Sequence, residues 1–194
     1  MPNYDFDFQS LLDAIQRQES SYNRDDPTAP TKQLPLVNPD SGARGQMQVK
    51  PSSAIKPGYA EFGAQSVFDV AEGLFPDKQF ERTDQAARDL LDIPEVNRAW
   101  AENYMMAMLE RFDGNVDQAV GAYNAGPGRM LNADRKYENL PEQTQEYINN
   151  VRQYYNQSTG DNYGITVAPR PQGRPQAGSL GMTQPRARPK GLLG

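Results

Sequence analysis

The stretch Ala122-Tyr123-Asn124-Ala125-Gly126-Pro127-Gly128 joins a helix-forming segment to an abrupt stop. We expect a helix over about 117–123, because the glycines and the proline that follow it end a helix. A glycine here also allows the backbone to approach a ligand that a Cβ atom would block. Tyr123 and Asn124 would then present a hydroxyl and an amide at the helix end. The alternative is an ordinary helix stop, with Tyr123 buried and Asn124 acting as a cap.

Glu19 continues the apolar face of a helix expected from Phe8 onward. Leu11, Leu12 and Ile15 are spaced three and four residues apart, and Glu19 follows Ile15 by one turn. Burial disfavours the charged form of a carboxylate and raises its pKa, which suits a general acid working near neutral pH. The alternative is that the helix ends near residue 18 and leaves Glu19 in solvent, as is usual for Glu.

The 194 residues include no cysteine and no histidine. Their absence excludes a disulfide framework, a thiolate nucleophile, a Ser-His-Asp triad and nearly all zinc sites. Among the common hydrolytic chemistries this leaves carboxylates as acid and base, and cleavage of glycosidic bonds uses carboxylates. We therefore expect neither a metal ion nor a cofactor.

Apolar residues at helical spacing recur along most of the chain, and no segment alternates convincingly with a period of two. Further helices are expected over about 65–74, 82–91, 94–112 and 141–156. The stripe in the longest of these is expected to be core; it consists of Val96, Trp100, Tyr104, Met108 and Phe112. The fold class is therefore mainly α, with a minor β hairpin in the loops or none.

Composition divides the chain into a domain at 1–156 and a tail or linker at 157–194. The second part is rich in proline, glycine and arginine and lacks apolar periodicity, so we expect it to be disordered or extended. The net charge is -5, but five basic and no acidic residues follow Asp161, which leaves -10 on the part up to Asp161. An acidic body argues against nucleic acid as a partner of the folded domain.

Four segments, in order, resemble the motifs of the soluble lytic transglycosylase family, whose SLT domain is similar to goose-type lysozyme. They are 19–23, 38–48, 122–126 and 140–147, and the similarity spans roughly 11–155. The resemblance implies a lysozyme-like helical domain with a cleft for peptidoglycan glycan strands. It also implies cleavage of the β-1,4 bond between N-acetylmuramic acid and N-acetylglucosamine, with closure of a 1,6-anhydro ring on the muramic acid.

The same resemblance implies roles for individual residues. Glu19 would be the catalytic acid, and the substrate-binding residues would be Ser20, Met47, Gln48, Tyr123, Asn124, Ala125, Gly126 and Tyr147. For Met47 a place in the core is the alternative, because methionine fills irregular gaps in cores.

The chain departs from the family at two positions, and two other functions stay open. Gln46 stands where the family usually has Leu, and Gln143 where it usually has Glu. One alternative is a virion structural protein with an inactive domain of this fold. The other is a hydrolytic muramidase, which would need a second carboxylate such as Asp25 or Asp26 to activate water.

The first eight residues have neither the basic segment nor the apolar segment of a secretory signal, and no stretch is long and apolar enough to span a membrane. A wall-cutting enzyme then needs another route to its substrate. Domains of this family occur in bacteriophage virion proteins. We therefore expect a virion protein, or a protein delivered to the periplasm, that opens the wall when a phage enters or lyses a cell. The alternatives are an endolysin released through holes in the membrane and a mature fragment of a secreted bacterial enzyme. Other virion proteins are the expected partners of the basic tail.

Overall fold

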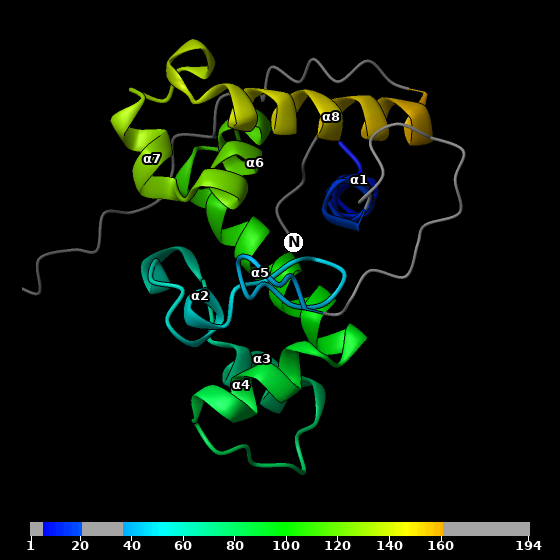
Figure 1. The fold of residues 1–194 in the computed structure, drawn as a ribbon, viewed down its shortest axis with the longest axis vertical. Helices are drawn as coiled ribbons and strands as arrows, with labels where there is room; N and C mark the ends of the chain where they lie inside the picture. Colours follow the sequence, from blue (N-terminus) through cyan, green and yellow to red (C-terminus); the bar gives the residue numbers. More distant parts are fainter. Residues whose placement is uncertain (1–5, 21–36, 161–194) are drawn as a thin grey trace, which may run out of the picture.

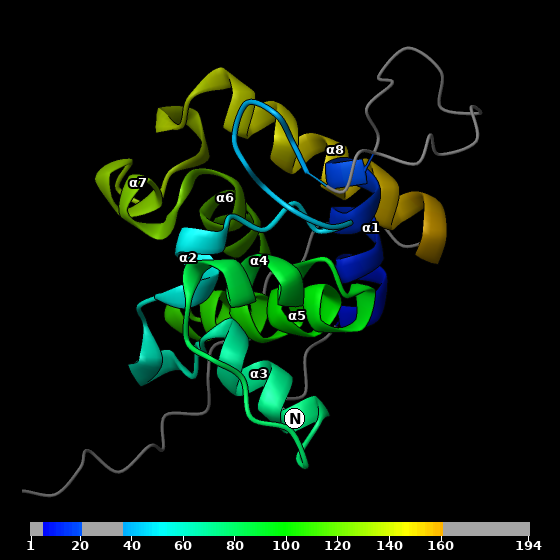
Figure 2. The ribbon, with the colours of Figure 1, turned by 60° about the horizontal axis from the view of Figure 1, so that its bottom comes forward.

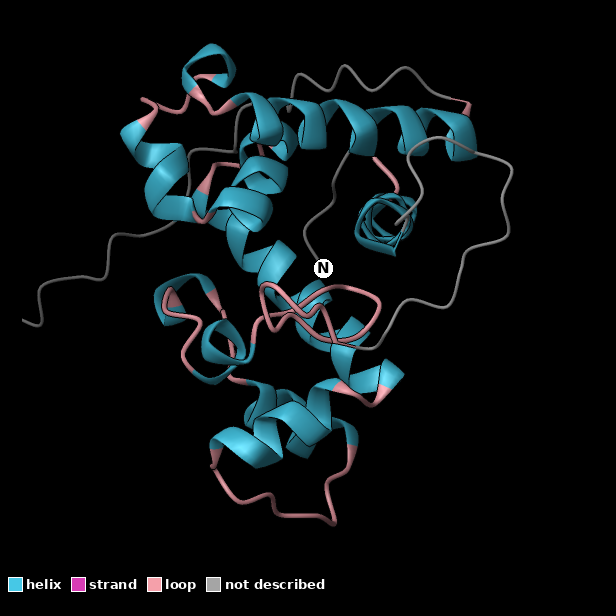
Figure 3. Ribbon diagram, viewed as in Figure 1, coloured by secondary structure: helices cyan, strands magenta, loops and turns pink. Residues whose placement is uncertain are grey.

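The computed structural model describes residues 6–20 and 37–160, and most of that part of the chain is helical. In chain order the elements are α1 (Phe8–Ser20), α2 (Pro51–Ile55), the 3₁₀ helix η1 (Ala60–Phe62), α3 (Val67–Leu74), α4 (Asp84–Leu91), α5 (Pro94–Arg111), α6 (Val116–Ala125), α7 (Pro127–Asn132), the 3₁₀ helix η2 (Tyr137–Asn139) and α8 (Glu142–Thr159). The described residues form isolated β bridges but no strand (Figure 3). The predicted mainly α fold is confirmed.

Helix α5 lies at the centre of the fold. Pro94 occupies its first turn, where the missing N–H of proline would have no helical partner in any case. Its buried residues include Val96, Ala101, Met105 and Met108, which face different directions around the helix. It packs against α3 and α4 toward one end of the molecule and against α6 toward the other (Figure 1). Because the buried residues of α5 face several directions, other helices pack on more than one side of it, and α5 fixes these groups of helices relative to each other.

Helix α1 packs against α8, although most of the chain separates the two helices (Figure 2). Leu11, Leu12 and Ile15 are fully buried on the inner face of α1. Helix α8 contributes Ile148 and Val151 to the same apolar cluster. The contact brings the C-terminal end of α1, where Glu19 lies, against α8.

Capping residues and prolines set the helix boundaries. Helices α3 and α4 begin two residues later than the sequence predicts, because the side chains of Ser66 and Thr83 accept hydrogen bonds from the first free N–H groups of each helix. Helix α6 ends at Ala125, two residues beyond the predicted residue 123, and Gly126 with φ of +87° stops it, as the sequence predicts. The short helices α2 and α7 were not predicted from the sequence. Both begin at a proline, Pro51 and Pro127, in the first helical position.

The last helix, α8, continues to Thr159 rather than ending at the predicted residue 156. Gly160 follows it with φ of +74°, a left-handed conformation that commonly closes a helix. The remainder of the predicted tail, from Asp161 onward, lies outside the described residues.

A tight turn over residues 44–49 is fastened to α5 by one buried side chain. Arg44 and Val49 exchange two backbone hydrogen bonds, at 2.9 and 3.0 Å. Within the turn, Asn97 of α5 accepts a hydrogen bond from the backbone N–H of Met47 at 2.9 Å and donates one to the carbonyl of Arg44 at 3.0 Å. Gly45 has φ of +68°, and a Cβ atom there would lie 2.4 Å from the Asn97 side chain. The turn therefore requires both Asn97 and a glycine at position 45.

Two glycine substitutions test this requirement, because both introduce nearly the same backbone strain. Gly45→Ala and Gly42→Ala both place an L-residue at a left-handed φ, +68° and +69°, at a cost of about 1–2 kcal/mol. Only at Gly45 does the new Cβ collide with Asn97, since no heavy atom lies within 4 Å of the Cβ position at Gly42. We expect Gly45→Ala to lower the free energy of unfolding by about 1–3 kcal/mol more than Gly42→Ala. Chemical denaturation measures the difference, and equal losses would contradict the role of Asn97.

Candidate active site

A cleft of about 670 Å³ opens beside the C-terminal end of α1. Its walls come from α1, the loop before α2, α5, the junction of α6 and α7, and the start of α8. Among the predicted site residues, those that line it are Glu19, Gln48, Tyr123, Asn124, Ala125 and Gly126. Gln143 and Thr144 line it as well, so the fold brings all four sequence motifs to one cleft.

Glu19 lies in the last turn of α1 and faces this cleft. Its Oε1 accepts a hydrogen bond from the Tyr147 hydroxyl at 2.7 Å. Burial of the carboxyl group raises its pKa from 4.5 to about 7, and the hydrogen bond from Tyr147 opposes part of that rise because it favours the charged form. Glu19 is half-buried, so the alternative of a solvated residue in the last turn does not hold. A carboxyl group with this pKa can both donate and accept a proton near neutral pH.

Tyr147 lies behind Glu19 on α8 and is 6% exposed. It was predicted to bind substrate, but it is not among the residues that line the cleft. Burial, together with the negative charge of Glu19, raises the pKa of the Tyr147 hydroxyl well above its ordinary value. The hydroxyl therefore stays protonated and donates to Glu19, so Tyr147 positions the carboxyl group.

Met47 and Ser20 also differ from the prediction that they contact substrate. The Met47 side chain is fully buried in the core, as its alternative reading proposed, and does not line the cleft. Its backbone carbonyl instead accepts a hydrogen bond from the Tyr123 hydroxyl at 3.0 Å. Ser20 is the last residue of α1, is half-buried, and is likewise absent from the cleft lining. Met47 thus acts through its backbone, because its side chain points into the core.

Gln48 and Asn124 supply amide groups on two sides of the cleft. Gln48 has φ of +46°, and its Nε2 donates a hydrogen bond to the Gly45 carbonyl at 2.9 Å. Asn124 is exposed near the end of α6. Gly126 follows, and a Cβ atom there would meet no protein atom within 4 Å. Position 126 therefore requires a glycine because of the positive φ, and the space beside this glycine is open to a ligand.

Two aromatic residues of α5 line the cleft, although the sequence pattern predicted them as core. Trp100 and Tyr104 stack with ring centroids 5.0 Å apart and an interplanar angle of 11°. Tyr104 in turn meets the edge of Tyr123 at 6.1 Å. Trp100 is indeed 3% exposed, so it belongs to both the core and the cleft wall. Helical spacing assigns such residues to one face, but it does not say whether that face is covered by protein or by substrate.

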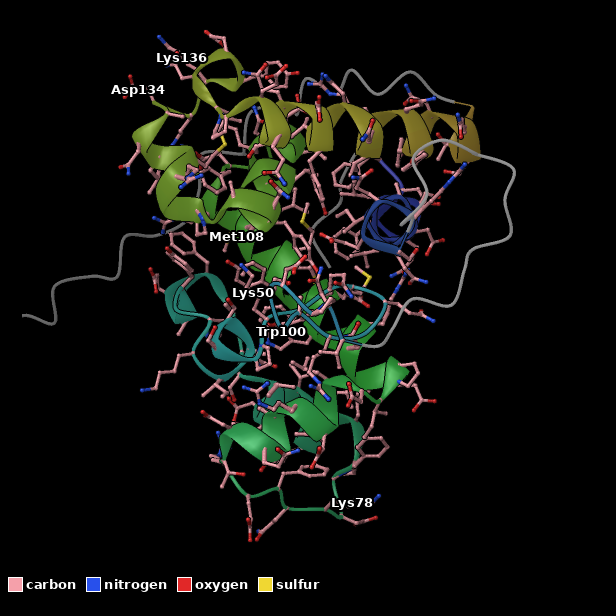
Figure 4. The ribbon with its side chains drawn as sticks, viewed as in Figure 1. Lys50, Lys78, Trp100, Met108, Asp134 and Lys136 are labelled. Atoms are coloured by element: carbon pink, nitrogen blue, oxygen red, sulfur yellow. The ribbon has the colours of Figure 1, made fainter. Side chains whose placement is uncertain are left out.

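The remaining charged residues of the cleft were not predicted from the sequence. Lys50, just before α2, and Arg129, on α7, line the cleft together with Glu19 (Figure 4 labels Lys50 and Trp100). Among the described lining residues, Glu19 is the single carboxylate. Asp40 is exposed in a turn and does not line the cleft, and Asp25 and Asp26 lie outside the described residues.

Neither a metal site nor a membrane span emerges from the described part of the chain. In residues 6–20 and 37–160 no three acidic side chains come together as potential metal ligands. No helix in these ranges is long and apolar enough to cross a membrane.

Residues 75–146 match the model of the transglycosylase SLT domain family. Over this stretch the chain is similar to the SLT transglycosylase family. The matched residues include Tyr123, Asn124 and Gln143 of the cleft, whereas Glu19 precedes them.

Two soluble lytic murein transglycosylases are similar to this chain over a longer stretch. The chain is 28% identical over 157 residues to the protein of Salmonella typhimurium and 29% identical over 164 residues to the protein of Escherichia coli K12. Each match covers 75% of this chain but 20% of the relative. The chain therefore spans about a fifth of the length of these curated relatives.

The raised pKa of Glu19 predicts a pH-dependent effect on the stability of this protein. Because the folded pKa of about 7 lies above the ordinary 4.5, the folded state binds the proton more tightly, and stability falls as pH rises from 4.5 to 7. Glu19→Gln removes this penalty. At pH 8 we expect the free energy of unfolding of the variant to be higher than that of wild type by up to about 3 kcal/mol. Near pH 4 we expect this difference to vanish. Thermal or urea unfolding at both pH values checks it; a pH-independent difference would contradict the burial of the carboxyl group.

Proposed function

We propose that this chain is a peptidoglycan lytic transglycosylase that cleaves the β-1,4 bond between N-acetylmuramic acid and N-acetylglucosamine. The observation that carries the proposal is the Glu19 carboxyl group, with a pKa near 7, held by Tyr147 at the wall of the cleft. The names of the relatives, soluble lytic murein transglycosylases, support the same substrate.

In the first step, protonated Glu19 donates its proton to the glycosidic oxygen. The bond between that oxygen and C1 of the muramic acid breaks, and positive charge develops at C1 and the ring oxygen. Because the pKa of Glu19 is near 7, a large fraction of the enzyme carries this proton at neutral pH. The departing N-acetylglucosamine leaves with a free hydroxyl group, and Glu19 becomes a carboxylate.

The second step uses the substrate itself where two-carboxylate glycosidases use a second acid. Glu19 is the single carboxylate of the cleft among the described residues, which supports a mechanism in which the acetamido oxygen of the muramic acid stabilises the charge at C1. Glu19 then accepts the proton of the 6-hydroxyl as that oxygen attacks C1. The product is a 1,6-anhydro ring, Glu19 is protonated again, and no water is consumed.

The other polar groups of the cleft are suited to hold the sugars. The amides of Gln48 and Asn124 offer donors and acceptors for hydroxyl and acetamido groups, and both lie in the cleft wall. Trp100 and Tyr104 stack on each other and supply an aromatic part of the cleft wall. The rest of the lining is largely polar, which suits a ligand rich in hydroxyl and amide groups.

We further propose that the enzyme degrades the wall locally when a phage enters or lyses a cell, as part of a virion or after delivery to the periplasm. The support is the sequence from residue 162 onward, whose proline, glycine and basic residues are typical of a linker that joins a module to a larger assembly. Mass spectrometry of purified phage particles tests this proposal, and the absence of the protein from such particles would contradict a virion role.

The products of the reaction distinguish the proposed transglycosylase from its alternatives. Incubation with peptidoglycan sacculi should release muropeptides that end in 1,6-anhydro-muramic acid, as measured by mass spectrometry. Glu19→Gln keeps the shape of the side chain but removes the acid, so we expect a loss of about 10²–10⁴-fold in rate. Asp40→Asn, a change of the same kind at an exposed turn residue outside the cleft, should act like wild type. Products heavier by one water would instead indicate a hydrolytic muramidase, and no products from the folded wild type would favour a structural role.

Tyr147→Phe should move the alkaline limit of activity. The hydroxyl stabilises the charged form of Glu19, so its removal raises the pKa of Glu19 further above 7. We expect kcat/KM, which falls with rising pH as Glu19 loses its proton, to fall at a higher pH in the variant. Tyr154→Phe removes the same atom from the same helix, away from the cleft lining, and is the control. A lower rate with an unshifted pH profile would mean that Tyr147 contributes packing alone.

A further inference from the structure

Two basic side chains line the candidate cleft without a partner. Lys50 precedes α2 and Arg129 lies on α7, and both are exposed. Within the described residues neither side chain forms a hydrogen bond or an ion pair, and neither stacks on an aromatic ring. Both therefore keep their full donor capacity for a ligand in the cleft.

Most other arginines of the described residues are engaged. Five of them form ion pairs with carboxylates: Arg44, Arg82, Arg98, Arg135 and Arg152. In an acidic protein such pairing is easily found, since the part up to Asp161 carries a net charge of -10. The two cations of the cleft are unpaired in these surroundings, which leaves an excess of positive charge in the cleft.

Charge within the cleft is the reverse of that of the body. Glu19 is the single carboxylate among the described lining residues, against the two cations, and Gln143 contributes a neutral amide. Positive charge in a concave site attracts anions and raises their local concentration, because the protein walls restrict screening by water. The ligand that fits such a cleft is therefore an anion.

Lys50, just before α2, and Arg129, in α7, lie away from α1. Helices α2 and α7 lie on one side of the molecule in both ribbon views, and α1 lies on the other (Figures 1 and 2). The cleft lining includes residues from all three of these regions. A polymer lying in the cleft can thus contact the Glu19 carboxyl group with one unit and the cations with another part of the same strand.

We propose that Lys50 and Arg129 recognise a carboxylate of the glycan substrate and make the enzyme selective for acidic strands. This inference rests on the proposed function, because it concerns the substrate of the same cleft. The forked donors of Arg129 match the two oxygens of a carboxylate, and Lys50 adds a mobile point charge. Muramic acid carries a carboxyl group on its lactyl ether, which is free on a bare strand or joined to a peptide with carboxylates of its own. Both sources present the same chemistry.

The test measures binding separately from turnover. Lys50→Gln with Arg129→Gln removes both charges, and Lys56→Gln with Lys136→Gln changes the net charge equally at exposed, unpaired lysines outside the cleft lining. All are made in Glu19→Gln protein, so that strands are bound but not cut. Trp100 is the single tryptophan of the chain and lines the cleft, so its fluorescence reports binding. The probes are peptide-bearing strands, strands stripped of peptide by an amidase, and both kinds with their carboxylates converted to methylamides.

We expect the cleft variant to bind carboxylate-bearing strands at least about tenfold more weakly than its parent, while the lysine control stays within about twofold. Parent protein should bind methylamide strands as weakly as the cleft variant does, and its affinity should fall with salt. Retained selectivity on stripped strands identifies the lactyl carboxylate as the ligand. Selectivity confined to peptide-bearing strands identifies a carboxylate of the peptide.

Two results would overturn the inference. One is equal affinity of the cleft variant and its parent for acidic strands. The other is an equal loss of affinity for acidic and methylamide strands, which would mean that the two side chains contact uncharged groups. If carboxylate-selective binding is observed but wild type releases no anhydro products, the inference holds and the proposed reaction fails, so the two can be judged independently.

Discussion

The hydrogen bond from Tyr147 to Glu19 Oε1, at 2.7 Å, joins the first described helix to the last, and the candidate site is arranged around it. It exists because the apolar faces of α1 and α8 pack together. The same packing encloses the carboxyl group, so burial raises its pKa to about 7 while the hydroxyl limits the rise. Core packing and acid strength thus have one cause: the apolar contact that stabilises the fold also withdraws water from Glu19.

The opposite wall of the cleft depends on a buried polar side chain. Asn97 is 1% exposed, and it bonds to backbone groups on both sides of Gly45. A buried amide is tolerated only when its hydrogen bonds are made, and here the turn makes them. This turn also places Gln48 at the cleft, and its Met47 carbonyl accepts the hydrogen bond from the Tyr123 hydroxyl. A residue of the central helix therefore sets the position of two neighbouring parts of the site.

The charge of the cleft suits both the proposed acid catalysis by Glu19 and the proposed preference for acidic strands. A second carboxylate close to Glu19 would raise the pKa of one of the pair, as like charges do, and would repel an acidic substrate. The described lining contains none, and Gln143 is neutral where the family usually has an acid. A single acid, two cations without partners and an aromatic wall fit the proposed reaction, in which the substrate supplies both the anion that is bound and the groups that complete the reaction.

The sequence by itself determined the helical class, the position of Glu19 on an apolar face and the stop after α6, because each follows from local spacing and from the backbone preferences of glycine and proline. Family resemblance added the order of the motifs. Only the tertiary structure decided which motif residues reach the cleft: Met47 turns its side chain into the core, Tyr147 lies behind Glu19, and Trp100 and Tyr104 form a wall. The same is true of Lys50 and Arg129, which line the cleft from separate parts of the chain. A periodic pattern says which residues avoid water, whereas only the packing of helices distant in sequence decides whether protein or substrate excludes the water.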